Sequence, residues 1–175
     1  MKAAALASLA LCLTFLPGSA AAQSTPADAA ERMGVRLQSG TPMKIQSDEL
    51  DAVREEDGAE RIIFRQNVRV EQGDLEIYCD WLEALYLNGA GGQADQVTAR
   101  GKVRLLQAGS EASCSEAVFD NVRQTASCTT KGGKSRLRRG KDVIKADRID
   151  FDLKTGRFRA SGSVEVEMGS EGETE

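Results

Sequence analysis

The stretch IQSDEL at residues 45–50 decides the fold, because the chain repeats it three times. The copies are IYCDWL at 77–82, the looser ASCSEA at 112–117 and IKADRI at 144–149, and successive copies start 32, 35 and 32 residues apart. Repetition at such a period is typical of one supersecondary unit stacked on itself, since a single unit cannot bury its own apolar face. We therefore expect a domain built from stacked repeats of about 30–35 residues.

A second short line repeats in phase with the first. VRV at 68–70, VRL at 103–105 and SRL at 135–137 each begin 12 residues before the fourth position of a hexapeptide, and VEV at 164–166 closes the series. The residue two positions upstream is glycine in three of these four copies, and Gln66 in the first. Glycine accepts backbone angles that a β-carbon forbids, so each line predicts a strand that follows a bend.

Alternation of apolar and polar residues with a period of two extends from Met43 to Val166. Clusters rich in Gly, Asn and Asp interrupt it, for example at 56–58, 72–74, 88–92 and 154–156. No window carries a sustained helical pattern. The sequence predicts an all-β domain of roughly a dozen strands.

The ends of the chain differ from this repeating part. Residues 1–22 combine Lys2, an apolar run too short to span a bilayer and an Ala-rich end, which is typical of a cleaved secretory signal peptide. A lipoprotein signal modified at Cys12 is the alternative, although Leu11 is bulkier than the usual preceding residue. We expect a flexible lead at 23–41, the β domain at 42–168 and a disordered acidic tail at 169–175.

Composition argues against catalysis and against nucleic-acid binding. The chain has no histidine, which is the commonest general base, and no nucleophile-elbow serine or phosphate-binding glycine loop. The expected mature chain has 22 basic and 27 acidic residues, a net charge of −5, which gives no electrostatic support for nucleic-acid binding. We predict a protein that is not an enzyme and that has no catalytic residue, no metal site and no cofactor.

Three aspartates, Asp48, Asp80 and Asp147, occupy the same position of the hexapeptide. A whole repeat separates them, so they form a row of like charges along the stack and not an acid–base pair. We expect them to stabilise strand corners. The basic stretch Lys131 to Arg148 has two interpretations: a solvated outer face of a half-buried strand, or a patch that meets an anionic head group or an acidic partner.

The expected mature chain has three cysteines in a compartment that permits disulfides, so at least one has no intramolecular partner. Cys114 and Cys128 flank an expected hairpin that turns at 121–124, which favours pairing between them. Cys79 shares a register with Cys114, and that pairing is the alternative. We predict a Cys114–Cys128 disulfide and a buried, free Cys79.

With the secretory signal and these phased lines, the chain resembles the LptA/OstA family of periplasmic lipopolysaccharide-transport proteins. The resemblance covers residues 41–168, and it is carried by PMKIQSD at 42–48 and QNVRV at 66–70. It departs from the family at Gln66, Lys102 and Ser163, so those corners are expected to be built differently. The resemblance implies an open, V-shaped β-jellyroll with an apolar groove between two sheets. A content of 5% aromatic residues suits a groove that acyl chains fill.

The resemblance implies a periplasmic bridge that binds the acyl chains of lipopolysaccharide and carries it from the inner to the outer membrane. Its partners would be a bilayer-anchored inner-membrane protein and an outer-membrane barrel protein with related domains. Unpaired strands at both ends of the stack predict head-to-tail self-association. The alternatives are a repeat-built scaffold or glycan-binding module with a dry core and, less favoured, a polysaccharide-active β-helix enzyme. The residues expected to line the lipid groove are Met43, Ile45, Val68, Val70, Ile77, Val103, Leu105, Leu137, Ile144 and Phe158.

Overall fold

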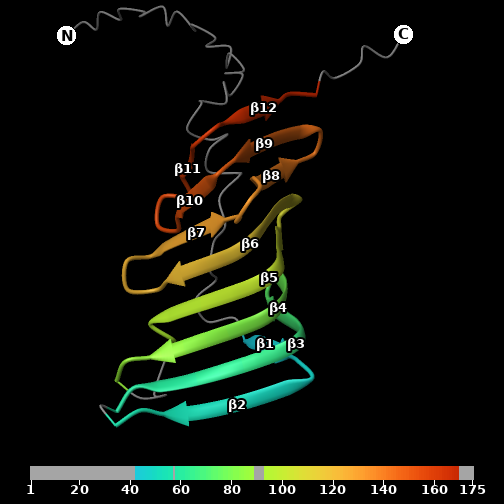
Figure 1. Ribbon diagram of the computed structural model, residues 1–175. Coiled ribbons are helices and arrows are strands. Elements are labelled where there is room, and N and C mark those ends of the chain that lie inside the picture. Colours follow the sequence, from blue (N-terminus) through green and yellow to red (C-terminus); the bar gives the residue numbers. More distant parts are fainter. Residues whose placement is uncertain (1–41, 57, 89–92, 170–175) are drawn as a thin grey trace, which may run out of the picture.

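A computed structural model describes residues 42–56, 58–88 and 93–169 (Figure 1). The expected signal peptide at 1–22, the lead at 23–41 and all of the expected tail except Gly169 lie outside the described residues. The described part is all-β, as predicted, and its twelve strands form one antiparallel sheet. The strands are β1 (Met43–Gln46), β2 (Glu49–Arg54), β3 (Glu60–Gln72), β4 (Leu75–Tyr86), β5 (Gln96–Gln107), β6 (Ser110–Asp120), β7 (Thr125–Thr129), β8 (Ser135–Arg139), β9 (Asp142–Ala146), β10 (Arg148–Asp152), β11 (Phe158–Ser161) and β12 (Glu165–Glu167).

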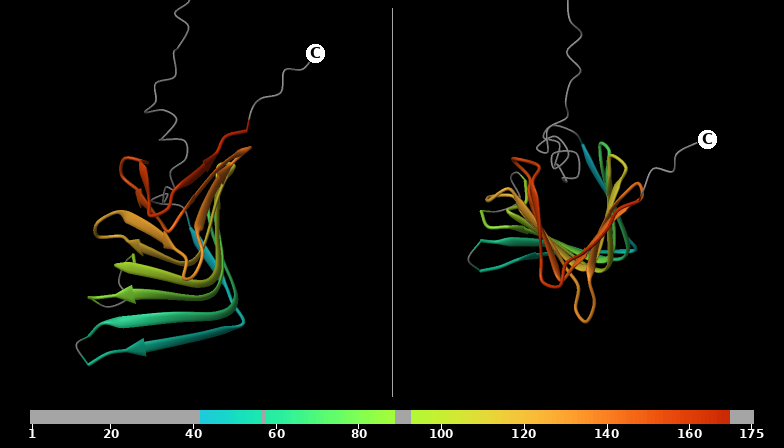
Figure 2. Two further views of the ribbon diagram at one scale, coloured as in Figure 1. Left: turned by 45° about the horizontal axis from the view of Figure 1, so that its top comes forward. Right: turned by 90° about the horizontal axis from the view of Figure 1, so that it is seen from above.

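The sheet folds along a line that crosses every repeat, and this gives the V shape seen along the stack in Figure 2. The long strands β3 to β6 run through the bend, where the register of each successive pair is interrupted. Elsewhere the chain breaks into separate strands on the two sides. We call the two halves the first arm, with the hydrogen-bonding order β1-β3-β4-β5-β6-β8-β9-β12, and the second arm, with the order β2-β3-β4-β5-β6-β7-β10-β11.

The aspartates of the repeat lie at these corners, opposite residues with left-handed backbone angles. Gly101 has φ +78°, and a β-carbon built on it would lie 2.6 Å from the Asp80 carboxylate, so only glycine fits there. Gly162 lies against Asp147 in the same way, and the Asp147 amide donates to its carbonyl oxygen at 3.0 Å. The corner role expected for the aspartates therefore fits their positions.

The first corner solves the same problem without glycine. Gln66 and Asn67 both have positive φ, 64° and 50°. The Asp48 amide donates to the Gln66 carbonyl oxygen at 3.1 Å, and Asn67 Nδ2 donates to the Asp48 carboxylate at 2.6 Å. Gln66, which departs from the family pattern, has a contact that glycine lacks, because its Nε2 donates to Glu49 Oε1 at 2.9 Å. Asn67 suits its position because asparagine tolerates left-handed angles better than most residues.

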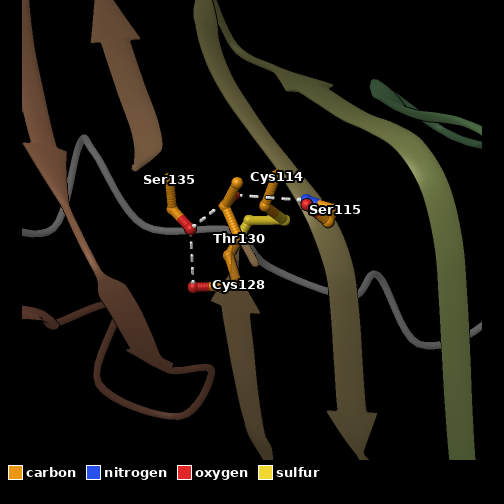
Figure 3. The surroundings of a disulfide bond; sticks show 5 residues. All are labelled: Cys114, Ser115, Cys128, Thr130 and Ser135. Carbon is orange, nitrogen blue, oxygen red and sulfur yellow. Dashed lines mark hydrogen bonds between the residues drawn. A yellow bond between two sulfur atoms is a disulfide. The ribbon is translucent and has the colours of Figure 1, made fainter. Parts of the chain in front are cut away.

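The third corner, where Ser115 replaces the aspartate, is built from a disulfide and a chain of hydrogen bonds (Figure 3). Cys114 of β6 and Cys128 of β7 form the disulfide, with Cα atoms 5.8 Å apart, while Cys79 is free and buried. The Ser115 amide donates to Thr130 Oγ1, which shares a hydrogen bond with Ser135 Oγ. Ser135 in turn donates to the Cys128 carbonyl oxygen at 3.2 Å. Since Cys114 belongs to the first arm and Cys128 to the second, the disulfide ties the arms together at the bend.

The outer face carries ion pairs, most of them between strands, that neutralise much of the basic stretch. Arg138 and Arg104 both bind Glu111, at 2.6 and 3.0 Å. Lys134 pairs with Glu165 at 2.7 Å, and Arg148 pairs with Asp150 at the same distance. Pairs of this kind favour the interpretation of the stretch as a solvated outer face.

Candidate functional site: the groove between the two arms

A continuous row of apolar side chains crosses the inner face of the first arm. Each member lies directly opposite the next in the strand register, so the row passes through all eight strands of that arm. The row is Ile45, Val70, Ile77, Leu105, Ala112, Leu137, Ile144 and Val166. Side chains in one row share a face of the sheet, and here Ile45, Val70 and Ile77 line a cavity together with residues of the second arm.

Six of the ten residues predicted for the groove belong to this inner row. Val68 and Val103 lie on the same arm one row closer to the bend, where both are fully buried. Met43 is at the outer end of β1, opposite Gln72, and Phe158 is on the second arm, opposite Phe151. The structure thus places eight of the ten residues in the inner row of the first arm or in the row next to it. Of the predicted set, Met43, Ile45, Val70 and Ile77 line the cavity described below.

The prediction missed almost the whole lining of the second arm, which forms two further inner rows. One row is Leu50, Phe64, Leu82, Ala99, Ala117, Cys128, Ile149 and Ala160. The other is Ala52, Ile62, Ala84, Val97, Phe119, Ala126, Phe151 and Phe158. A signal for the first row was present in the sequence, because the last residue of each hexapeptide copy, for example Leu82 or Ile149, belongs to it.

Near the N-terminal end of the stack, a cavity of about 350 Å³ lies between the arms. Volumes of this order are typical of small-molecule sites. Ile45, Val70 and Ile77 line it from the first arm, and Phe64 and Phe119 line it from the second. Gln72, Tyr86, Gln93 and Asn121 are the polar residues among its lining, and none of the residues that line it is charged. Such a cavity suits an uncharged, largely apolar ligand.

The arms meet in the middle of the stack. Leu105 of the first arm and Phe119 and Phe151 of the second are buried there, and they surround a void of only about 10 Å³. Phe119 lines both the large cavity and this small void. The groove in this structure is therefore open at the N-terminal end of the stack and packed shut at its centre.

Both edges of the sheet expose large apolar side chains. Met43 and Leu50 are 52% and 59% exposed on β1 and β2, and Val166 and Met168 are 58% and 80% exposed at the opposite edge. Singly exposed apolar residues are common on soluble proteins, but these four extend the inner face to the unpaired strands at the two ends of the stack. They mark both edges as candidate contact surfaces.

Two ionisable groups with shifted pKa values illustrate the rest of the molecule: Glu111 lies on the outer face, and Cys79 is a buried thiol. Hydrogen bonds from Arg138, and then from Arg104, lower the pKa of Glu111 on the outer face, against the opposing effect of burial. Burial raises the pKa of the Cys79 thiol to about 11. Across residues 42–56, 58–88 and 93–169, no three His, Cys, Asp or Glu side chains gather as a metal site would require. Within the same residues, no helix is long and apolar enough to cross a membrane.

Comparison with known proteins agrees with this geometry. An uncharacterized protein of Rhizobium meliloti (strain 1021) is 27% identical over 174 residues, which cover 94% of this chain and 89% of that protein. The fold matches the crystal structure of LptH, the LptA homologous periplasmic component of the lipopolysaccharide transport device of Pseudomonas aeruginosa. That match has a TM-score of 0.60 and 12% identity, and it covers 74% of this chain and 96% of LptH. Residues 44–157 match the family described as LptA/(LptD N-terminal domain) LPS transport protein, and the chain therefore belongs to this family.

Proposed function

We propose that this protein binds lipopolysaccharide in the periplasm and carries it from the inner toward the outer membrane. The observation that supports the proposal most directly is the groove itself. Its inner rows are apolar across the whole stack, and the cavity at its N-terminal end has no charged residue in its lining. Acyl chains fit such a lining, whereas the phosphates and sugars of the lipid stay outside it.

Binding of this kind needs no catalytic group. Each methylene moved from water into the groove contributes about 0.8 kcal/mol, so one acyl chain gives substantial affinity. The cavity also distinguishes this proposal from a glycan-binding module with a dry core, because an apolar cavity between the arms has no role in binding a saccharide at the outer face.

Head-to-tail assembly is the second part of the proposal. β1 and β2 at one end and β11 and β12 at the other offer unpaired backbone groups, which favour the addition of a further strand. The two ends differ, so the contact is heterologous and extends the stack with its groove. The partners at the ends of such a bridge would be an inner-membrane protein and an outer-membrane barrel protein with related domains.

Photo-crosslinking tests the groove. A benzophenone amino acid replaces Ile45, which lines the cavity, or Arg104, whose side chain is on the outer face. Irradiation with lipopolysaccharide is expected to capture the lipid at Ile45 and not at Arg104. Equal capture at both positions, or none at Ile45 in a folded variant, would contradict an acyl-chain groove.

A further inference from the structure

The strand directions at the two edges allow the sheet to continue from one copy into the next. In the first arm, β1 runs toward the bend and β12 runs away from it, just as β1 and its neighbour β3 do. In the second arm, β11 runs toward the bend and β2 runs away from it. Placing β12 beside β1 of the next copy, and β11 beside β2, therefore keeps the antiparallel alternation in both arms at once.

The inner rows restrict the register of this junction. The inner row of the first arm ends at Val166 on one edge and begins at Ile45 on the other. The row of the second arm ends at Ala160 and begins at Leu50. Rows that pass straight across the junction place Val166 opposite Ile45 of the next copy and Ala160 opposite Leu50. A shift by one residue would turn every apolar side chain outward, whereas a shift by two keeps the faces but offsets the rows.

The same register has a consequence on the outer face. One residue beyond Val166, Glu167 comes to lie opposite Lys44 of the next copy. One residue before Ala160, Arg159 comes to lie opposite Asp51. We infer that two complementary charge pairs, Glu167 with Lys44 in the first arm and Arg159 with Asp51 in the second, stabilise the junction at which a second copy of this chain docks in this register. This inference rests on the head-to-tail assembly proposed above.

The local environment of the four residues supports the inference. Lys44, Asp51, Arg159 and Glu167 are all exposed, and each belongs to an edge strand. Asp51 is already held by Arg65, and Glu167 by Lys145, from the strand on the inner side of each edge. Each carboxylate is thus positioned within its own copy by a charge from the neighbouring strand. Cross-strand pairs of opposite charge stabilise neighbouring strands, and like charges directly opposite destabilise them.

Cysteine pairs test the register directly. In a Cys79→Ala background, Asp51→Cys is combined with Arg159→Cys, or with Arg157→Cys as the matched control that shifts the register by two residues. Directly opposite positions bring β-carbons within reach of a disulfide, whereas diagonal positions two residues away are too distant. The first combination is expected to give a ladder of covalent oligomers on a non-reducing gel, and the second is not. Equal or faster crosslinking of the shifted pair would overturn the inference.

A charge exchange gives an independent test. Lys44→Glu changes only one edge of the sheet and is expected to weaken self-association at least fivefold in sedimentation, an order-of-magnitude value for replacing an exposed attractive pair by a repulsive one. Adding Glu167→Lys in the same chain is expected to restore part of the association, because the pair is then inverted at every junction, although the pair of Glu167 with Lys145 is lost. If the double variant does not regain self-association while wild type still forms oligomers, the proposed charge pairing is contradicted but head-to-tail assembly is not. A wild-type protein that stays monomeric at all concentrations would reject the assembly as well, although lipid capture at Ile45 would still support the groove.

Discussion

Removing the disulfide is expected to lower the stability of the domain by a predictable amount. Cys114 and Cys128 are 14 residues apart, so the bond closes a loop of about 15 residues in the unfolded chain. The loss of unfolded-state entropy for such a loop is worth about 3 kcal/mol, which for a domain of this size corresponds to a melting temperature lower by roughly 10 °C. We predict this change for Cys114→Ala combined with Cys128→Ala.

Thermal unfolding followed by circular dichroism measures the effect, with wild type in reductant as a second route to the same state. Cys79→Ala is the matched control, since it removes a buried thiol without opening a crosslink. The control is expected to lose much less stability, because only the packing of one sulfur atom is lost. A double variant whose melting temperature lies within about 2 °C of wild type, far less than the decrease expected from loop entropy, would refute the reasoning.

Three further predictions concern the corner, the outer face and the free thiol. Gly101→Ala is expected to destabilise the protein by at least about 1 kcal/mol more than Gly109→Ala, as measured by urea unfolding. Both glycines have φ +78°, but only a β-carbon at position 101 would collide with Asp80. Equal losses of stability would argue against the steric explanation. Glu111→Gln is expected to lower stability at neutral pH. The difference from wild type should vanish as the pH falls through the lowered pKa of Glu111, because a carboxyl group with a lowered pKa stabilises the folded state only when it is ionised. A difference that does not change with pH would contradict this. Iodoacetamide at pH 8 should leave Cys79 unmodified in the native protein, because burial raises the pKa of its thiol to about 11. After unfolding in guanidinium, the reagent should modify it. Rapid labelling of the native protein would contradict the burial of Cys79.

The fold was predictable from the sequence to the level of repeats and corners. The two phased repeat lines predicted an all-β domain. The glycines upstream of Val103 and Val164 predicted bends, and the structure has bends at Gly101 and Gly162. A shared register of the hexapeptides followed from their spacing. The spacing does not predict which residues face inward in the half of each strand beyond the corner, because the irregular register at the bend changes the alternation.

This explains why the predicted groove residues came mainly from one arm. Leu82 is five residues after Ile77, so simple alternation places it on the opposite face of β4, yet both line the same cavity. The interruption of the register between Tyr78 and Trp81 reverses the alternation, and the bend turns the second half of the strand to face the first. The closure at Leu105, Phe119 and Phe151 depends on the distance between the arms, and no local pattern encodes that distance.

The corners have a consequence for how such a protein can diverge. Asp80 and Gly101 are held by backbone geometry and by each other at the bend, and Asp80 is solvent-exposed and does not line the cavity. Substitutions at cavity-lining positions such as Ile77 can therefore change the size and shape of the cavity while the corners stay as they are. Such a lining can diverge one residue at a time, while the frame that holds it stays the same.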